Sequence, residues 1–178
     1  MEKIKLLKVN FRQARADDLA TVMKIIDDAK RALAQQKIPQ WQDGYPNLAA
    51  LQADLVAQRL WVGTANQQVI LTMSLVLGPD PNYQQIFGGH WQQASDDYLT
   101  VHRIAVAPAA GKQGVAHRAL QFACDLAKKQ GLRSVRIDTH QCNQPMQALV
   151  SSLPFRRCGQ VYMADHSPRI AYEYVLTT

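Results

Sequence analysis

The middle of the chain carries the feature that most constrains its fold: an apolar strand, a proline, a glycine-containing turn and an amphipathic helix in direct succession. The strand is predicted over residues 98–107 and stops at Pro108; the helix is predicted over 111–130 and stops at Gly131. The turn consists of Gly111, Lys112, Gln113, Gly114, Val115 and Ala116. Such a turn exposes backbone N–H groups at the positive end of a helix, where phosphate oxygens bind. We therefore expect a phosphorylated cofactor at this turn.

Length and composition indicate a globular protein with a single core. The chain has 178 residues, of which 47% are hydrophobic, and we expect one domain over residues 1–178. Cys124, Cys142 and Cys158 are too scattered for a disulfide framework and form no C-x-x-C pair, so we expect no metal site. The lysines and arginines behind the net charge of +6 are spread along the chain, which favours a solvated surface over a nucleic-acid-binding one.

Neither a secretion signal nor a membrane span is predicted. Residues 1–15 mix Glu, Lys, Asn and Arg with apolar residues, whereas a secretion signal needs an uninterrupted apolar region. No apolar run approaches the roughly 20 residues that cross a bilayer. These patterns predict a cytoplasmic protein.

Hydrophobic periodicity and helix caps divide the first half of the chain into five elements. Asp17 and Asn47 are the predicted helix caps, and the region 38–47, with two prolines and a glycine, separates the two helices. Asn66-Gln67 is a plausible hairpin turn. The predicted elements are a strand over 5–15, helices over 17–36 and 47–58, and strands over 60–65 and 69–77.

In the second half, a long polar loop over 78–97 precedes the central strand, and loops of this length usually carry function or are mobile. Asn143 is the predicted cap of a short helix. The elements after the central strand and helix are a strand over 134–139, a helix over 143–153, and strands over 155–163 and 170–176. Together the elements predict a mixed α/β sheet with helices on both faces.

The order of elements, with two local motifs, resembles the GNAT superfamily of N-acetyltransferases over nearly the whole chain. The segment 102–108 with the turn 111–116 is similar to the family's cofactor motif of Arg or Gln, two variable residues, Gly, a variable residue, and Gly or Ala. Gly114 and Ala116 match the last two fixed positions, whereas Gly111 stands where Arg or Gln is usual. Asp138-Thr139-His140 with Asn143 resembles the end of the family's fifth strand and the start of its next helix. The resemblance implies a GNAT-like, mainly antiparallel sheet of about seven strands.

The resemblance also implies direct acetyl transfer from acetyl-CoA to an amine. Phosphate oxygens would bind backbone N–H groups of the turn, with Lys112 adding positive charge. Pantetheine would run along the edge of the central strand, and an N–H group of Ile104 or Val106 would bind the carbonyl oxygen. The cofactor-binding residues implied are Ile104, Ala105, Val106, Gly111, Lys112, Gln113, Gly114, Val115, Ala116 and Asn143.

Removal of a proton from the acceptor amine needs a base, and His102 is the first candidate. Strict alternation along the strand puts it on one face with Thr100, Ile104 and Val106, and imidazole exchanges protons near neutral pH. A structural histidine beneath the substrate loop is the equally weighted alternative. His140 is the second candidate, with hydrogen bonding that holds the turn to Asn143 as its alternative role.

A general acid for the departing thiolate is harder to identify. Many members of the family carry a tyrosine seven residues after the helix-capping Asn, and Val150 occupies that position here. Tyr162, Ser151, a water molecule, or no acid at all are the alternatives. A thiol pKa near ~8.5 makes an acid helpful rather than obligatory.

Aromatic residues in the two long loops are candidates for the acceptor pocket. Trp41 and Tyr45 could bind an amine by packing or cation–π contact, and Tyr83 and Trp91 lie in the second loop. Packing at the edge of the sheet is the alternative for each.

Three functions therefore remain open. The first is an acetyl-CoA-dependent N-acetyltransferase that acts on a small amine or on a peptide or protein amine, as a monomer or homodimer. The second is a catalytically idle acyl-CoA-binding regulatory module, which the missing tyrosine suggests. The third, nucleic-acid binding, is disfavoured by the scattered charge.

Overall fold

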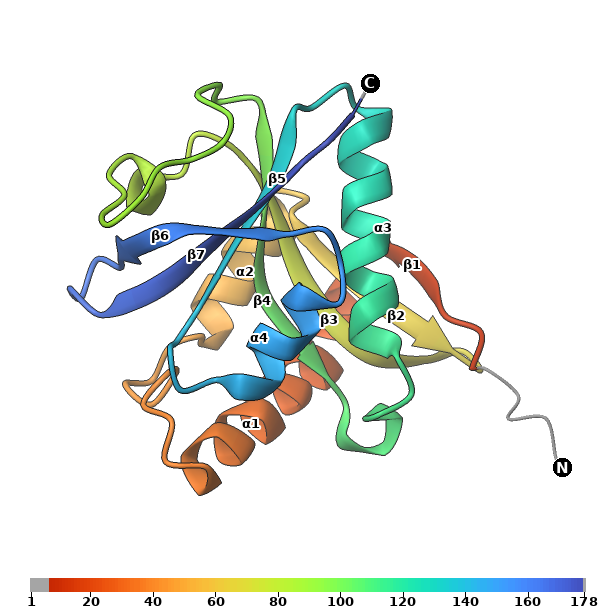
Figure 1. Ribbon diagram of the computed structural model, residues 1–178. Helices are drawn as coiled ribbons and strands as arrows, with labels where there is room; N and C mark the ends of the chain where they lie inside the picture. Colours follow the sequence, from red (N-terminus) through yellow and green to blue (C-terminus); the bar gives the residue numbers. More distant parts are fainter. Residues whose placement is uncertain (1–6, 178) are drawn as a thin grey trace, which may run out of the picture.

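Across residues 7–177, which the computed structural model describes, the chain forms a seven-stranded sheet covered by two α-helices on each face (Figure 1). The elements are β1 (Asn10–Gln13), α1 (Leu19–Gln35), α2 (Leu48–Val56), β2 (Leu60–Ala65), β3 (Gln68–Leu77), β4 (Tyr98–Val106), α3 (Val115–Lys129), β5 (Ser134–Thr139), α4 (Gln144–Ser151), β6 (Arg156–Tyr162) and β7 (Pro168–Val175).

The strand order is β1-β2-β3-β4-β5-β7-β6. All neighbouring pairs are antiparallel except β4 and β5, which run parallel. This arrangement confirms the predicted mixed, mainly antiparallel sheet. Its one parallel pair lies at the centre, between the strand that precedes the glycine-containing turn and the strand that follows the next helix.

Two separate apolar clusters hold the layers together. The larger cluster joins α3 and α4 to one face of the sheet and includes Leu120, Val135 and Val150. The smaller cluster joins α1 and α2 to the other face through Val22, Leu51 and Leu60. Both α1 and α3 place their apolar residues at helical spacing along one side, which is why each packs with a single face on the sheet.

The N-terminal strand is shorter than predicted. Pairing with β2 covers Asn10–Gln13, whereas the prediction ran from residue 5 to residue 15, of which Lys5 and Leu6 lie outside the described residues. The predicted cap Asp17 is also wrong, because a short 3-10 helix over Ala16–Asp18 precedes α1. Asp18 holds this corner: its carboxylate accepts hydrogen bonds from the guanidinium of Arg12 and from the N–H of Arg15.

The long loop between β3 and β4 is fastened to the sheet by a buried ion pair. Arg136 on β5 donates to Glu173 on β7 at 2.9 Å and to the carbonyl of Gln93 in the loop at 2.6 Å. The Glu173 carboxylate in turn accepts the N–H of Gln92 at 2.6 Å. The guanidinium of Arg136 also lies over the rings of Trp91 and Tyr98. The loop is therefore an ordered wall beside β4.

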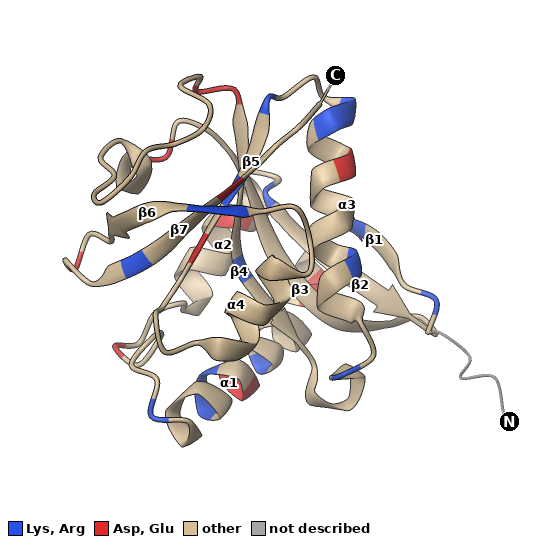
Figure 2. Cartoon of the chain, viewed as in Figure 1, with Lys and Arg blue, Asp and Glu red and all other residues tan. Residues whose placement is uncertain are grey.

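Charged residues do not gather on one element. Figure 2 shows Lys and Arg on several elements, among them α1, α3 and β6, with Asp and Glu interspersed. Among residues 7–177, no helix is both long and apolar enough to cross a membrane.

Candidate active site

The parallel strands β4 and β5 pair over only three residues and then separate. Their register joins Tyr98, Leu99 and Thr100 to residues 134–136, and among the described residues no further pair follows. A β-bulge in β4 accompanies the separation: Thr72 pairs with Ala105 and Ser74 with His102, so that β4 has one residue more than β3. Arg103, with φ of 52°, lies within the bulge. The bulge increases the bend of β4 where the gap opens.

The bulge reverses the side-chain alternation expected for β4. His102 lies across from Ser74, whose hydroxyl contacts Asp54 on α2, so His102 faces the α1–α2 side. Ile104 and Val106 instead pack with the α3 cluster. The prediction that His102 shares a face with Ile104 and Val106 is therefore wrong, because strict alternation fails at an inserted residue.

Backbone groups of β4 border the gap. The N–H of Ala107 donates to the carbonyl of Ile70 on β3 at 2.8 Å. Because successive residues of a strand direct their backbone groups to opposite edges, Ile104 and Val106 direct theirs away from β3 and toward β5. These two residues thus offer N–H and carbonyl groups to an extended ligand that enters the gap.

The turn after β4 keeps its N–H groups open at the start of α3. Gly114 is the N-cap with φ of 69°, and its carbonyl accepts the first helical hydrogen bond, from the N–H of Arg118, at 3.1 Å. The N–H groups of Val115, Ala116 and His117 precede that bond and have no acceptor inside the helix. The positive end of the helix dipole adds to their attraction for an anion.

No part of the described chain fills the space over this turn. Gly111, Lys112, Gln113 and Gly114 are exposed. A Cβ built on Gly114 would meet nothing within 4 Å. Arg118 donates to the carbonyls of Gln113 at 3.1 Å and Gly114 at 3.3 Å, and the N–H of Gly111 donates to the carbonyl of Pro108 at 3.1 Å. The N–H groups at the start of α3 are therefore the open donors of the turn. The open, donor-rich turn fits the pyrophosphate of a nucleotide cofactor.

A cavity of about 1100 Å³ extends along the gap, with Ala116 of α3 among its lining residues. Both strands contribute to it, β4 over residues 101–106 and β5 with its following turn over 137–140. Loop residues close its other side. The sequence-predicted residues that line it are His102, Ile104, Ala105, Val106, Ala116, His140, Asn143, Trp41 and Tyr45.

His102 forms a close pair with Asp80, which sequence reasoning did not identify. The Nε2 atom of His102 lies 2.7 Å from Oδ2 of Asp80. Asp80 is 6% exposed, and its Oδ1 accepts the N–H of Asn82 at 2.9 Å. Burial raises the pKa of the Asp80 carboxyl, but the hydrogen bond and charge of His102 and the bonds from Asn82 outweigh burial and hold that pKa below its usual value. Asp80 is therefore ionised at neutral pH.

A second ion pair joins the buried Asp54 to the partly buried Arg103, and both residues line the cavity. Arg103 donates to the carboxylate of Asp54 and, through Nε, to the hydroxyl of Tyr45 at 2.6 Å. Ser74 donates to the same carboxylate at 2.5 Å. Tyr45 thus joins the 38–47 loop to β4 and α2. Trp41, in the same loop, lines the cavity and packs against the smaller apolar cluster.

His140 has the hydrogen bonds of a turn-stabilising residue. Its Nδ1 accepts the N–H of Cys142 at 3.1 Å, and its carbonyl accepts the N–H of Asn143 at 2.9 Å. Burial, and secondarily the charge of Arg169, lowers the pKa of His140, so the ring is neutral and carries its proton on Nε2. This arrangement agrees with the alternative role that the sequence left open.

Asn143 connects α4 to the 38–47 loop. Its Oδ1 accepts the N–H of Met146 at 3.2 Å, the predicted cap, and its Nδ2 donates to the side chain of Gln40 at 3.2 Å. Asn143 lines the cavity near the start of α4.

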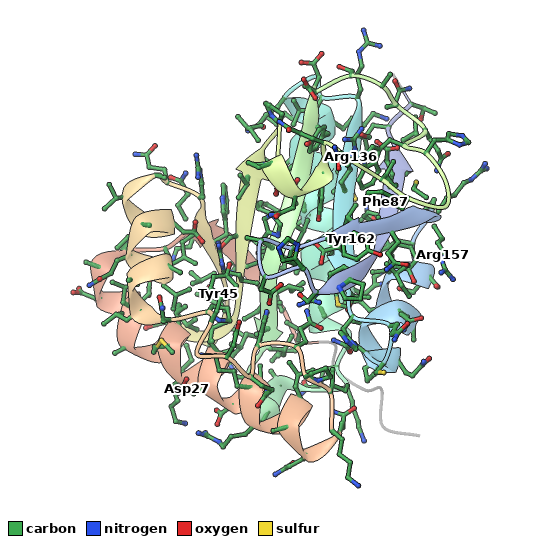
Figure 3. All side chains as sticks on the ribbon, turned by 90° about the vertical axis from the view of Figure 1, so that its left-hand side faces the viewer. Asp27, Tyr45, Phe87, Arg136, Arg157 and Tyr162 are labelled. Atoms are coloured by element: carbon green, nitrogen blue, oxygen red, sulfur yellow. The ribbon has the colours of Figure 1, made fainter. Side chains whose placement is uncertain are left out.

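The candidates for a general acid lie away from the cavity lining. Tyr162 is 42% exposed, packs edge-on against Phe87 at a centroid distance of 5.4 Å and accepts from Gln160 at 3.2 Å (Figure 3). Ser151 is exposed, and Val150 is fully buried in the α3–α4 cluster. None of the three is among the residues that line the cavity.

Within residues 7–177, no group of three or more His, Cys, Asp or Glu side chains is placed to hold a metal ion.

Comparison with known proteins identifies the architecture. A family model described as the acetyltransferase (GNAT) family matches residues 23–153. A GNAT-family acetyltransferase from Streptococcus agalactiae is 28% identical, with a TM-score of 0.87 over 97% of this chain and 99% of that protein. No curated protein matches the chain.

Two more distant structures share the fold. The ribosomal-protein-S18-alanine N-acetyltransferase from Escherichia coli is 16% identical, with a TM-score of 0.65 over 96% of each chain. The PaiA N-acetyltransferase from Thermoplasma acidophilum, whose crystal structure contains coenzyme A, is 14% identical, with a TM-score of 0.71 over 96% of this chain and 100% of its own.

Proposed function

The chain belongs to the GNAT acetyltransferase family, and we propose that it transfers the acetyl group of acetyl-CoA directly to an amine of a small molecule or of a peptide or protein. One observation carries this proposal: a single cavity is lined both by Ala116 at the open helix start and by His102 at the bulge of β4. The end of the turn that we propose binds phosphate and the side chain that we propose accepts a proton thus border one cavity, which supports a two-substrate transfer.

The residues that would hold acetyl-CoA are mostly backbone groups. N–H groups of residues 113–116 would bind the pyrophosphate, with Lys112 adding positive charge at the rim. The backbone of Ile104, Ala105 and Val106 would hold the pantetheine arm as a neighbouring strand would. Asn143 and the exposed Gly111 complete the proposed binding surface. Because main-chain groups do this work, the absence of Arg or Gln at position 111 removes one side chain and leaves the turn intact.

When bound, acetyl-CoA supplies an activated acetyl group, whose C–S bond breaks as the amine forms a C–N bond to its carbonyl carbon. The N–H of Ile104 or Val106 would stabilise negative charge on the carbonyl oxygen, because a fixed donor costs no reorganisation during the reaction. His102 would accept the proton that the amine loses.

The leaving group needs little help from the protein. The position of the family's usual tyrosine is the buried Val150, and Tyr162 lies outside the cavity lining. With a thiol pKa near ~8.5, a thiolate is stable enough to depart and take up its proton from solvent. We therefore favour a mechanism without a side-chain acid.

The acceptor amine would enter between the 38–47 and 78–97 loops. Trp41 and Tyr45 line the cavity there, and an aromatic ring attracts an ammonium group by cation–π contact. We propose these two residues as the acceptor-binding aromatics. Which amine binds depends on the residues that line this part of the cavity.

The buried Val150 also favours one alternative function, that of a catalytically idle acyl-CoA-binding module. Two measurements separate the candidates. Titration calorimetry with acetyl-CoA tests binding, and release of free thiol is followed across polyamines, amino acids, aminoglycosides and N-terminal peptides. We expect binding and amine-dependent thiol release with at least one acceptor. Binding with no release across the panel would favour the idle module, and no heat at millimolar ligand would exclude both.

A single domain over residues 1–178, a cytoplasmic location, and a monomeric or homodimeric state without nucleic acid or membrane partners complete the proposal. The domain assignment is supported by one continuous sheet, whose strands span the chain from Asn10 to Val175. Size-exclusion chromatography with light scattering tests the oligomeric state.

A further inference from the structure

We propose that Asp80 is a positioning residue that fixes the tautomer of His102, so that Nδ1 is the nitrogen that takes the proton from the acceptor amine. This inference rests on the proposed function, in which His102 is the base. It adds Asp80, from the 78–97 loop, to the residues that support proton transfer, and it names Nδ1 of His102 as the atom that accepts the proton.

The hydrogen bond between the two residues assigns the proton. An ionised carboxylate can only accept hydrogen bonds, and Oδ2 of Asp80 lies 2.7 Å from Nε2 of His102. Nε2 must therefore carry a proton in the neutral ring as well as in the charged ring. Nδ1 then holds the lone pair, and it forms no hydrogen bond with any residue in the range 7–177 that the structure describes. His102 lines the cavity, and Nδ1 is its ring nitrogen that is not paired with Asp80.

The surroundings of Asp80 hold its carboxylate in one orientation. Oδ1 accepts from both the backbone N–H of Asn82, at 2.9 Å, and the side-chain amide of Asn82, at 3.2 Å. The backbone N–H of Asp80 donates to the hydroxyl of Tyr98 at 2.7 Å. With Oδ1 occupied by two donors, Oδ2 is the oxygen left for His102.

Residues of the same loop that follow Asp80 in the chain also contact the sheet. The buried hydroxyl of Tyr83 donates to Oδ2 of Asp138 on β5 at 2.6 Å. The indole of Trp91 donates to the carbonyl of Tyr83 at 2.9 Å. These contacts hold the loop against β5, and the bond from the N–H of Asp80 to Tyr98 holds it against β4, so Asp80 is already placed beside His102.

This geometry makes an unusual prediction for Asp80→Asn. Asn82 presents two donors to the Oδ1 position, so the amide oxygen of the variant must occupy that position. The amide NH₂ group then takes the place of Oδ2 and donates to Nε2 of His102. The proton of the neutral ring moves to Nδ1, and the atom that should accept the amine proton is blocked. Asp80→Ala removes the partner without reversing the tautomer.

The primary experiment reads the tautomer directly, by ¹⁵N nuclear magnetic resonance of the full chain with ¹⁵N-labelled histidine. Spectra are recorded near pH 9, above the usual titration range of imidazole. The signal of His102 is identified among the five histidines by its loss in His102→Gln. We expect the proton on Nε2 in the parent and on Nδ1 in Asp80→Asn. A parent ring protonated on Nδ1, or an unchanged tautomer in Asp80→Asn, would overturn the proposal.

The second readout is kcat, measured with an amine that supports thiol release in the acceptor panel. We expect kcat to fall about 100-fold in Asp80→Asn and less in Asp80→Ala, with the dissociation constant of acetyl-CoA unchanged in both. The order is diagnostic, because a merely structural role would tolerate the isosteric Asn better than Ala. Higher activity in Asp80→Asn than in Asp80→Ala would contradict the proposal. Asp97→Asn, on the same loop but exposed, is the matched control and should keep parental turnover.

The two readouts separate failure of this inference from failure of the proposed function. Full activity in His102→Gln would remove His102 as the base, whatever its tautomer. Loss of activity in His102→Gln together with an unchanged tautomer in Asp80→Asn would retain the base and reject the role of Asp80.

Discussion

The proposed cofactor side and the proposed acceptor side of the site are built in different ways. The proposed cofactor side is a run of six consecutive residues, 111–116, which begins in an exposed turn and reaches the cavity at Ala116, and its proposed ligand groups are backbone N–H groups. The acceptor side combines three separated segments, the 38–47 loop, the 78–97 loop and β4, through side chains such as Arg103 with Tyr45 and His102 with Asp80. One half of the site is local backbone conformation, and the other is tertiary structure.

This difference predicts how a substitution in each half affects ligand binding and folding stability. A substitution in the turn should remove ligand binding. Its effect on the free energy of unfolding should be close to that of the same substitution at a comparable turn elsewhere in the chain. We call the paired side chains of the acceptor side the acceptor wall. A substitution there should destabilise the fold itself, because its carboxylates, Asp54 and Asp80, are buried and paired. The four predictions that follow test this contrast.

The largest effect is expected from Asp54→Ala. It removes the buried carboxylate that the partly buried guanidinium of Arg103 and the buried hydroxyl of Ser74 share. We expect the free energy of unfolding to fall by about 3 kcal/mol, measured by urea denaturation. The double variant Asp54→Leu with Arg103→Met should recover most of this loss, because it removes both charges. A loss below about 1 kcal/mol in the single variant would show that the wall is not held by this pair.

The second prediction concerns Gly114→Val, with Gly131→Val as its matched control. Both glycines have left-handed φ values, 69° and 73°, and both lack any atom within 4 Å of an added Cβ. The two variants should therefore share a similar strain of about 1–2 kcal/mol. At Gly114 alone, the side chain would occupy the proposed phosphate site, and we expect the affinity for acetyl-CoA to fall about 100-fold or more by calorimetry. Equal affinities in the two variants would place the cofactor elsewhere.

The third prediction uses the lowered pKa of Asp80. Because the folded-state pKa lies below the unfolded value of about 3.9, the ionised group stabilises the fold above that pH, and its contribution is lost as the pH falls through the folded-state pKa. The stability difference between the parent and Asp80→Ala should thus be full above about pH 5, on the order of 1.5 kcal/mol, and shrink toward pH 3. A difference that stays constant over this range would contradict the assignment.

The smallest effect is expected from Asn143→Ala, which removes the helix cap of α4 and the contact with Gln40. Melting of the protein without ligand should show a loss of about 1 kcal/mol. Gln40→Ala removes only the contact between the loop and Asn143, so it should cost clearly less. Equal losses in both variants would mean that the loop contact, rather than the cap, carries the stability.

The same contrast explains how far the sequence alone could be interpreted. The turn was predictable because Pro108, Gly111, Gly114 and Gly131 mark local backbone conformation directly. The order and boundaries of most strands and helices followed from hydrophobic periodicity in the same way, including the caps at Asn47 and Asn143.

The acceptor wall was not predictable, because its contacts join residues far apart in the chain. Asp80 and His102 are separated by 22 residues, and Asp54 and Arg103 by 49. The bulge at Arg103 was equally invisible, since its sequence carries no glycine and continues an apolar strand pattern. The missed cap at Asp17 has a similar origin: the Arg12–Asp18 pair fixes a 3-10 turn that local preference does not specify.

The central claim is that one cavity brings an acyl donor, held by the backbone of residues 111–116, beside His102. Diffraction from crystals soaked with acetyl-CoA tests this claim most directly. We predict electron density for the pyrophosphate within hydrogen-bond distance of the N–H groups of residues 113–116, and for the thioester in the gap between β4 and β5 near His102. Density for the nucleotide at any other surface, with the gap unaltered, would contradict it.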